Sequence, residues 1–242
     1  MQKQPLNENG RSRRAILPAI LVFLLMPATI LFGVLRLGDR KYYFVSLLII
    51  LYAMLPFFLV FEKRRPQARE LIVISVLAAI ATAGRAAFFM LPQCKPVIAI
   101  VVITGVCFGG ESGFLVGAVT GFVSDFFFGQ GPWTPWQMFS FGIIGFLAGI
   151  FFTRGILKKN KLGLCLFGAL SAFFLYGGIM DLSTVFTFTS EVTLGAVLAA
   201  FAAGFWFNLV HASATVVFLF LLAEPMTEKL ERIKIKYGML EP

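Results

Sequence analysis

The sequence predicts an all-α protein, a polytopic membrane helix bundle, and three observations support this: its composition, its apolar runs and its basic residues. Of the 242 residues, 59% are hydrophobic and 14% are charged, and the mean hydropathy is +0.88. Soluble domains carry about a quarter charged residues, so a soluble enzyme, a disordered tail and a disulfide scaffold are excluded. A span needs about 20 apolar residues, and eight candidate runs occur at 16–35, 42–61, 70–91, 96–108, 113–128, 137–153, 162–180 and 195–223.

These runs divide the chain into four regions. We expect a cytoplasmic N-terminus (1–15), two additional transmembrane helices (16–61), a six-helix core (69–223) and a cytoplasmic tail (224–242). The apolar run that follows the basic N-terminus lacks a cleavage site, which favours an uncleaved span over a signal peptide. Eight spans leave no room for an ATPase domain, so any energy from ATP must come from a partner.

The basic residues predict the orientation. The net charge is +9, and in a membrane protein an excess of Lys and Arg marks the cytoplasmic loops, so we expect lipids and not nucleic acid around it. With the N-terminus inside, the inner segments hold 16 Lys and Arg and the outer loops hold 4, while Arg85 lies within a span. This bias predicts that both termini are cytoplasmic.

The residues needed for catalysis or for metal binding are scarce. The three cysteines form no CxxC pair, there is one histidine, and no HExxH, GxSxG or P-loop motif occurs,. General acid–base chemistry is hard to assemble from so few groups. We therefore expect neither an enzyme, nor a cofactor, nor a metal site.

Two ionisable residues lie inside predicted spans, where a charge is costly and indicates function by default. Arg85 follows Glu70 by 15 residues and Asp125 follows Gly113 by 12, which places them about 22 Å and about 18 Å along their helices. Both then reach the outer half of the bilayer, where they could pair. Two compatible interpretations stay open: a buried ion pair that fixes the bundle, and polar groups at the floor of an outward-facing pocket.

The segment SDFFFGQGPWTPWQM (124–138) predicts a lid over a binding pocket. Its prolines stiffen the loop, its glycines let the backbone approach a ligand, and its glutamines supply amide groups beside aromatic rings. Apolar walls with a few placed polar groups are typical of a small-molecule pocket, whereas tryptophans alone are typical of an aromatic belt. The substrate-contact candidates here are Phe128, Gln130, Trp133, Trp136 and Gln137.

Two later segments are expected to contribute to the entrance of the same pocket. The second outer loop, 181–193, is rich in Thr and Ser and predicts an extended flap. In the last span, Asn208 is a further substrate-binding candidate. For His211 a hydrogen-bonded packing role is favoured, because a lone histidine in such a helix more often packs than binds a ligand, and a functional role is the alternative.

Glycines recur every four residues in two neighbouring spans. They occupy positions 109, 113, 117 and 121, and then 145 and 149. Small residues at this spacing let helix backbones approach closely. We expect them to pack within the bundle, with an inter-subunit face as the alternative.

The stretch that begins at Arg69 resembles a known family. RELIVISVLAAIATAGRAAFF (69–89) is similar to the first core helix of the substrate-specific S components of energy-coupling factor (ECF) vitamin importers, in which alanines at i, i+4 spacing follow a basic entry. The resemblance covers about 69–223, which holds six spans, as the family core does. GQGPWTPWQM (129–138) is similar to the cobalamin-type subgroup, and the two extra spans at 16–61 depart from the family pattern.

The resemblance implies a mechanism. An S component binds a vitamin, here cobalamin or a related corrinoid, in a pocket on the outer side. It associates with a transmembrane coupling protein and two ATPases, and ATP hydrolysis then topples it so that the pocket opens inward. Ala79, Ala83 and Ala87 would form the coupling interface, because a flat helix face allows close contact. Packing of these alanines inside the bundle is the alternative.

Other functions stay open. The chain could be an S component for a different vitamin or for a modified nucleobase. From another class, a stand-alone secondary transporter would need coupling-ion residues at mid-membrane, for which Arg85 and Asp125 are few. A purely structural membrane protein is the remaining alternative.

Overall fold

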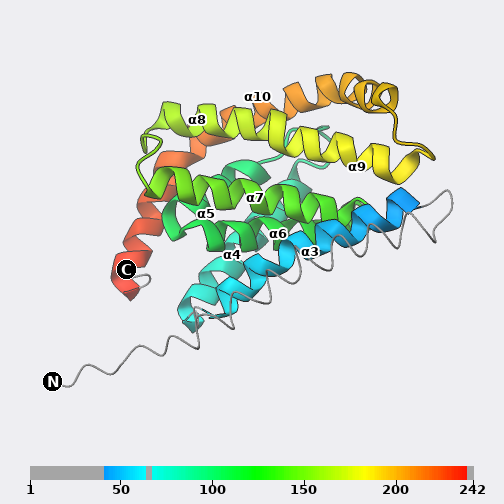
Figure 1. Cartoon of the computed structure of the whole chain (residues 1–242). Helices are drawn as coiled ribbons and strands as arrows, with labels where there is room; N and C mark the ends of the chain where they lie inside the picture. Colours follow the sequence, from blue (N-terminus) through cyan, green and yellow to red (C-terminus); the bar gives the residue numbers. More distant parts are fainter. Residues whose placement is uncertain (1–40, 64–66, 239–242) are drawn as a thin grey trace.

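The computed structural model describes residues 41–63 and 67–238, and every regular element in these ranges is a helix (Figure 1). Five helical stretches are long and apolar enough to cross a membrane, which confirms the predicted class of polytopic helix bundle. Residues 1–15 and 239–242 and the predicted span 16–35 lie outside the described residues. The helices are α3 (Lys41–Lys63), α4 (Ala68–Ala87), α5 (Val97–Phe108), α6 (Gly110–Phe128), α7 (Thr134–Thr153), α8 (Lys161–Leu170), the π-helix η2 (Ser171–Gly177), α9 (Gly178–Phe188) and α10 (Leu194–Tyr237).

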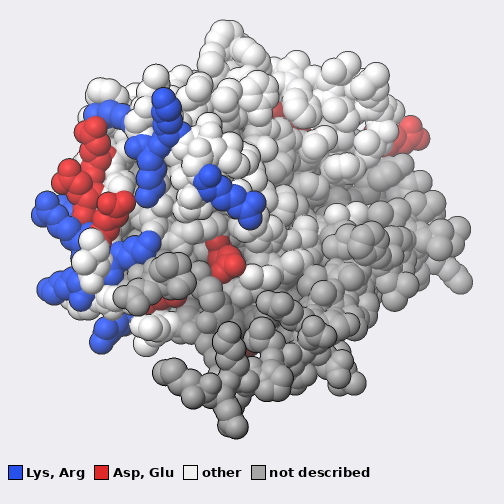
Figure 2. All heavy atoms as spheres, turned by 60° about the vertical axis from the view of Figure 1, so that its left-hand side comes forward, with Lys and Arg blue, Asp and Glu red and all other residues white. Residues whose placement is uncertain are grey.

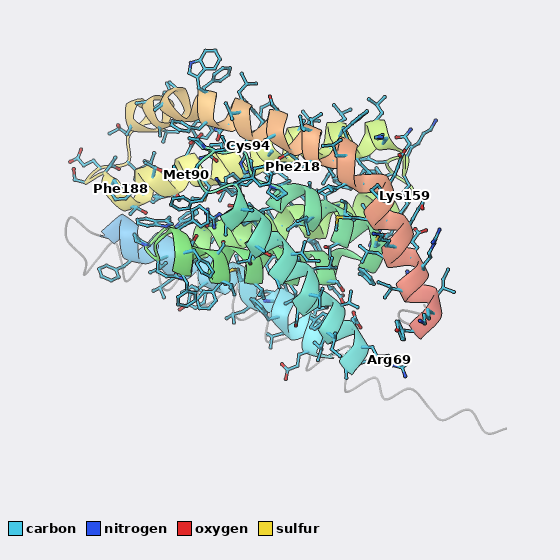
Figure 3. All side chains as sticks on the ribbon, turned by 180° about the vertical axis from the view of Figure 1, so that it is seen from behind. Arg69, Met90, Cys94, Lys159, Phe188 and Phe218 are labelled. Carbon is cyan, nitrogen blue, oxygen red and sulfur yellow. The ribbon has the colours of Figure 1, made fainter. Side chains whose placement is uncertain are left out.

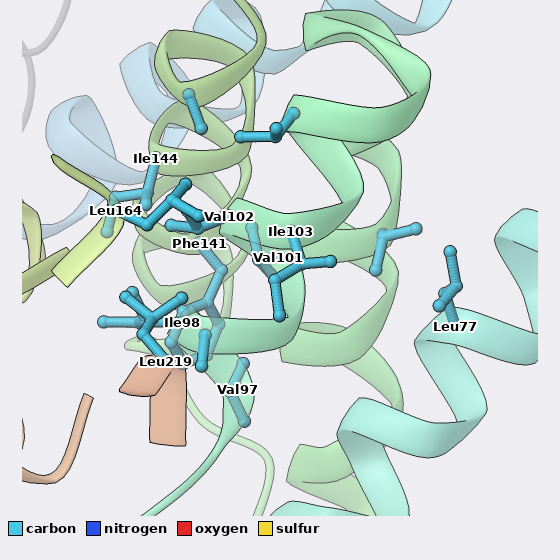
Figure 4. Close-up of a cluster of buried hydrophobic side chains, with 14 of the residues drawn as sticks. Leu77, Val97, Ile98, Val101, Val102, Ile103, Phe141, Ile144, Leu164 and Leu219 are labelled. Atoms are coloured by element: carbon cyan, nitrogen blue, oxygen red, sulfur yellow. The ribbon is translucent and has the colours of Figure 1, made fainter. Parts of the chain in front are cut away.

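Helix α5 forms the centre of the bundle. All of its 12 residues are buried. A helix that is apolar on every side lies in a protein core or in lipid, and here other helices surround it. It contacts α6, α7 and α10. Figure 4 shows its side chains, such as Val101 and Val102, beside Phe141 and Ile144 of α7 and Leu219 of α10.

Glycines bring α5, α6 and α7 into backbone contact. A Cβ added to Gly113 would lie 2.5 Å from the carbonyl oxygen of Gly145, and one added to Gly117 would lie 2.5 Å from that of Phe141. A Cβ on Gly149 would collide with the backbone nitrogen of Gly110. The prediction that the glycine stripes pack within the bundle is confirmed at these positions.

Gly109 has a different task from the other glycines of its stripe. Its φ of 89° lies in the region that favours glycine,. As the single residue between α5 and α6, it closes the tight helical hairpin that the short predicted spans allowed.

Helix α3, which covers the predicted span at 42–61, packs on the core. Phe57 stacks on Phe114 of α6 with ring centroids 4.0 Å apart, and it meets Phe146 of α7 edge-on at 4.8 Å. Met54, one turn earlier, is buried. Helix α3 therefore covers the α6–α7 side of the bundle.

The prediction of an extended flap at 181–193 is wrong for most of this segment. Residues up to Phe188 continue the preceding helix, so that 161–188 forms one helical stretch and only 189–193 link it to α10. Two interactions hold this polar segment in a helix. Val185 and Ser183 are buried, and the hydroxyl groups of Ser183 and Thr184 donate to the carbonyl oxygen of Met180, which satisfies them within the helix.

Helix α10 is longer than the predicted span at 195–223. It has 44 residues and continues through Pro225 to Tyr237. Its buried residues Ala223 and Leu230 keep this extension against the bundle, and Lys234 donates to the carbonyl oxygen of Cys107 at 3.4 Å. Residues 224–237 of the expected tail are thus helical.

Charged side chains gather at one end of the molecule, as Figure 2 shows. We call the six residues of three ion pairs there the charged end: Lys159–Glu231, Lys161–Glu224 and Arg232–Glu228. Figure 3 shows Lys159 and Arg69 toward this end and Phe188 toward the opposite end. The bundle therefore has two chemically different ends.

Candidate functional site

A buried ion pair joins α4 and α6 away from the charged end. Arg85 lies in the last turn of α4 and Asp125 in the last turn of α6. Arg85 Nη1 is 2.8 Å from Asp125 Oδ1, and the two side chains are 11% and 1% exposed. The two intramembrane charges of the sequence therefore do pair.

Arg85 has further partners around this pair. Nη1 also donates to Gln137 Oε1 at 3.0 Å and to the hydroxyl of Ser124. The guanidinium lies over the ring of Phe128, 4.4 Å from its centroid, which is within the range of a cation–π interaction. One arginine thus joins side chains from α4, α6 and α7.

The second oxygen of Asp125 is also satisfied. Thr134, at the start of α7, donates to Oδ2 at 2.8 Å and accepts a hydrogen bond from the backbone of Gly131. This links the end of α6 to the start of α7. The carboxylate therefore fixes both ends of the connecting loop.

A further hydrogen bond extends the cluster from α7 to η2, and a ring contact extends it to α10. Gln137 Nε2 donates to the hydroxyl of Tyr176 at 2.8 Å. The Tyr176 ring is stacked on Phe141, with centroids 4.8 Å apart, and meets His211 edge-on at 4.7 Å. We call Arg85, Ser124, Asp125, Phe128, Thr134, Gln137 and Tyr176 the Arg85 cluster.

The segment that links α4 to α5, residues 88–96, is attached to the cluster through Lys95. Its ammonium donates to the carbonyl oxygens of Phe88 and Leu91, the latter at 2.7 Å, which caps the end of α4. It also lies 5.6 Å from the centroid of the Phe128 ring, on which Arg85 packs. Burial lowers the pKa of Lys95, and the nearby positive charge of Arg85 lowers it further.

Three of the predicted loop residues lie beside the cluster without joining it. Gln130 donates to the carbonyl oxygen of Phe122 at 2.9 Å and is exposed. Trp133 donates to that of Gly129 at 3.3 Å. Trp136 is buried and stacks on Phe186 of α9, 5.8 Å between centroids. Gln130 and Trp133 therefore stabilise the loop, and Trp136 joins α7 to α9.

Asn208 belongs to a second polar pair. Its Nδ2 donates to Asp181 Oδ2 at 2.8 Å. Glycines make room for both partners, because a Cβ on Gly204 would collide with Asp181 and one on Gly177 would collide with the Asn208 amide. The structure thus places Asn208 with α9 rather than with Arg85.

The three alanines predicted as a coupling interface lie on the face of α4 that points away from the bundle. Ala79, Ala83 and Ala87 are all exposed, while the opposite face buries Leu77 and Ala81, among others. The alternative, that these alanines pack inside the bundle, is wrong.

Sequence reasoning missed three residues of the site, and it interpreted a fourth, His211, as a hydrogen-bonded packing residue. Ser124, Thr134 and Tyr176 belong to the cluster, and His211 lies against it. Tyr176 provides a hydroxyl in a largely apolar run that also holds Ser171, and nothing in that run indicates its partner on α7.

Two hollows lie outside the cluster. An apolar groove of about 410 Å³ runs between α7 and the α8–η2 stretch and includes Phe151 and Leu166. A smaller one of about 150 Å³ lies between Gln93, in the link from α4 to α5, and Trp206 of α10. Neither is lined by a residue of the Arg85 cluster.

Comparisons with known proteins agree with this architecture. Residues 66–228 match the family model of the ECF-type riboflavin transporter S component. The chain is 31% identical over 138 residues to a UPF0397 protein of Aliivibrio salmonicida, covering 55% of this chain and 73% of that one. It is 35% identical over 100 residues to a UPF0397 protein of Vibrio atlanticus, covering 39% and 53%. No solved structure matches the chain significantly.

The comparisons also correct one expectation. The matched model is of the riboflavin type, so the cobalamin-type resemblance of GQGPWTPWQM is not supported. The match begins at residue 66 and leaves α3 outside it, while it contains every residue of the Arg85 cluster. Because it covers well over half of the sequence, the chain belongs to the family of ECF-type riboflavin transporter S components.

Proposed function

We propose that this chain captures a vitamin-sized substrate at the Arg85 cluster and delivers it through an ECF coupling protein and two ATPases. Proteins of its family are not enzymes; they bind a small molecule and work with ECF transmembrane and ATPase modules. The observation that carries the proposal is the buried pair of Arg85 and Asp125. Charges inside a membrane bundle are costly and mark functional sites.

Riboflavin is the first substrate to test, because the matched family carries its name. The chemistry of the cluster supports a planar heteroaromatic ligand. Arg85 and Gln137 offer donors next to the acceptor Asp125, and the rings of Phe128 and Tyr176 flank them. Such rings stack on a flat ligand, while the polar groups bind its edge.

We further propose that the charged end faces the cytoplasm and the Arg85 cluster faces outward. The excess of Lys and Arg in the segments at that end supports this orientation,. The cluster then lies where an importer first meets its substrate.

We assign docking on the coupling protein to the face of α4 that points away from the bundle. Ala79, Ala83 and Ala87 are exposed there, and small side chains let a second helix approach closely. A bulky residue at the middle position is expected to prevent that approach while the cluster stays intact.

Substrate binding is tested on the purified full chain in detergent, by the quenching of riboflavin fluorescence during a titration. Gln137→Leu removes a cluster residue, whereas Gln130→Leu removes a glutamine that bonds only the backbone of Phe122 among the described residues. We expect Gln137→Leu to weaken binding about tenfold and Gln130→Leu to change it little. Equal affinity in both variants would place the substrate elsewhere. Tight binding of a different vitamin or of a modified nucleobase would change the substrate and keep the site.

Coupling is tested by riboflavin uptake in cells that supply the ECF modules. Ala83→Trp should abolish uptake and leave the binding of riboflavin in detergent unchanged. Ala199→Trp is the matched control, since Ala199 is also an exposed alanine but lies on α10; its uptake should stay near the wild-type level. If both variants transport normally, the α4 face is not the docking surface.

A further inference from the structure

His211 is a buried imidazole without polar partners. Its side chain is 3% exposed, and among the residues that the structure describes neither Nδ1 nor Nε2 has a hydrogen-bond partner. This is unusual, because burying a polar group without a hydrogen bond is costly and most such groups are paired.

One neighbour of His211, Tyr176, belongs to the Arg85 cluster. The rings of His211 and Tyr176 form a T-shaped contact, with 89° between their planes. The Tyr176 hydroxyl accepts a hydrogen bond from Gln137, and Gln137 accepts one from Arg85. A continuous series of contacts therefore leads from the ion pair to His211 on α10. At the end of this series stand two nitrogen atoms with unused hydrogen-bonding capacity.

We propose that His211 hydrogen-bonds the ring edge of the bound substrate, as a specificity-determining residue of the site. This inference rests on the proposed function, since it takes the Arg85 cluster as the substrate site. Its ligand is an uncharged heteroaromatic edge in which a carbonyl oxygen and a ring N–H stand side by side. Binding supplies the partners that the imidazole lacks.

The chemistry of the imidazole favours this class of ligand. A neutral imidazole offers one donor and one acceptor, on ring nitrogens that point in diverging directions, so one of them can bind either the carbonyl oxygen or the ring N–H of such an edge. The rings of Tyr176 and Phe141, stacked on each other and buried, make the surroundings of the imidazole apolar, which strengthens a hydrogen bond made there. A site that hydrogen-bonds a polar edge also rejects analogues without it, because its own buried groups then stay unpaired.

The alternative is a structural histidine that binds a buried water molecule. Buried waters satisfy polar groups that the protein leaves unpaired. In that case riboflavin would leave the environment of the imidazole unchanged, and removal of the imidazole would not change affinity.

The composition of the chain allows a direct measurement. His211 is its only histidine, so protein labelled with ¹⁵N-histidine and purified through a histidine-free affinity tag gives ring signals from this residue alone. We expect saturation with riboflavin to move at least one ring ¹⁵N resonance to the value of a hydrogen-bonded nitrogen. Unchanged resonances at saturation would overturn the inference without any mutation.

Variants provide the second measurement. His211→Phe keeps an aromatic ring and removes both nitrogens; its affinity for riboflavin should fall about tenfold, while the melting temperature of the ligand-free protein should not fall. His211→Gln, which retains a donor and an acceptor, should recover part of the affinity. Ser213→Ala is the control, because Ser213 is exposed on the same helix and bonds only its own backbone turn among the described residues.

An analogue separates the ring edge from the rest of the ligand. Lumiflavin keeps the ring system and lacks the polyol chain, so His211→Phe should weaken its binding by the same factor. An unchanged affinity for lumiflavin would assign His211 to the chain and overturn the ring-edge contact. If Gln137→Leu loses binding and His211→Phe does not, this inference is wrong and the proposed function stands. If the wild type binds neither riboflavin, nor another vitamin, nor a modified nucleobase, the proposed function is wrong as well.

Discussion

The Arg85 cluster and the charged end contain the same kinds of charged side chains in opposite environments. The side chains of Arg85 and Asp125 are 11% and 1% exposed, and their charged groups are 2.8 Å apart. Those of Lys159 and Glu231 are 44% and 50% exposed, and their charged groups are 3.4 Å apart. Removing one partner of a buried pair leaves a charge without compensation, which costs far more than removing one from an exposed pair. The difference teaches that ion pairs in this bundle must be weighed by burial rather than counted.

The largest expected effect comes from Asp125→Leu. The change leaves the Arg85 guanidinium in the bundle without its carboxylate and Thr134 without its acceptor. We expect the free energy of unfolding to fall by about 3–5 kcal/mol, measured by denaturant or thermal unfolding in detergent.

The double variant Arg85→Leu/Asp125→Leu sharpens this result. Without either charge, most of the lost stability should return, because replacing both members of a buried pair by apolar residues is often neutral or stabilising. Riboflavin binding should be lost in both variants, because each removes polar groups of the proposed site. A double variant as unstable as Asp125→Leu alone would show that the pair itself holds the bundle together, which favours the structural interpretation of the two charges.

An intermediate effect is expected at the start of α7. Thr134→Val keeps the shape of the side chain and removes the hydrogen bond to Asp125 Oδ2. Hydrogen bonds in membrane bundles contribute about 0.6 kcal/mol on average and up to about 1.7, so the melting temperature should fall modestly. Thr153→Val, at the other end of the same helix, removes a hydroxyl that bonds only its own helix among the described residues. An equal fall in melting temperature for Thr153→Val would show that the bond from Thr134 to Asp125 adds no stability of its own.

The sequence predicted the parts of this site that interrupt an apolar pattern. Arg85 and Asp125 are charges inside spans, and Gln137 and Phe128 flank an unusual loop, so each could be found from its neighbours alone. Tyr176 and Thr134 could not, because a hydroxyl in an apolar helix acquires its meaning only from a partner on another helix. The π-helix adds to this difficulty, since its wider turn shifts which side chains of residues 171–177 face the bundle,.

The same limit explains the predictions that failed or moved. The polar segment 181–188 has the composition of a loop, yet packing of Val185 and hydroxyl bonds to Met180 hold it in a helix. Gln130 and Gln137 are seven residues apart with the same chemistry, and only the turn of the loop sends one to Arg85 and the other to the backbone of Phe122. Local sequence contains neither of these tertiary contacts.

The smallest effect is expected from Glu231→Ala at the charged end. Exposed pairs contribute about 0–1 kcal/mol and are screened by salt, so the unfolding free energy should change little at low salt and not at all at high salt. The extension of α10 does not depend on this pair, because Leu230 and Ala223 are buried and Lys234 bonds the backbone of Cys107. A loss comparable to that of Asp125→Leu, persisting at high salt, would contradict the comparison and would mean that the charged end is held by its charges. Burial of Leu230 predicts instead that Leu230→Ala destabilises this end more than Glu231→Ala does, since it removes buried apolar contacts rather than an exposed attraction.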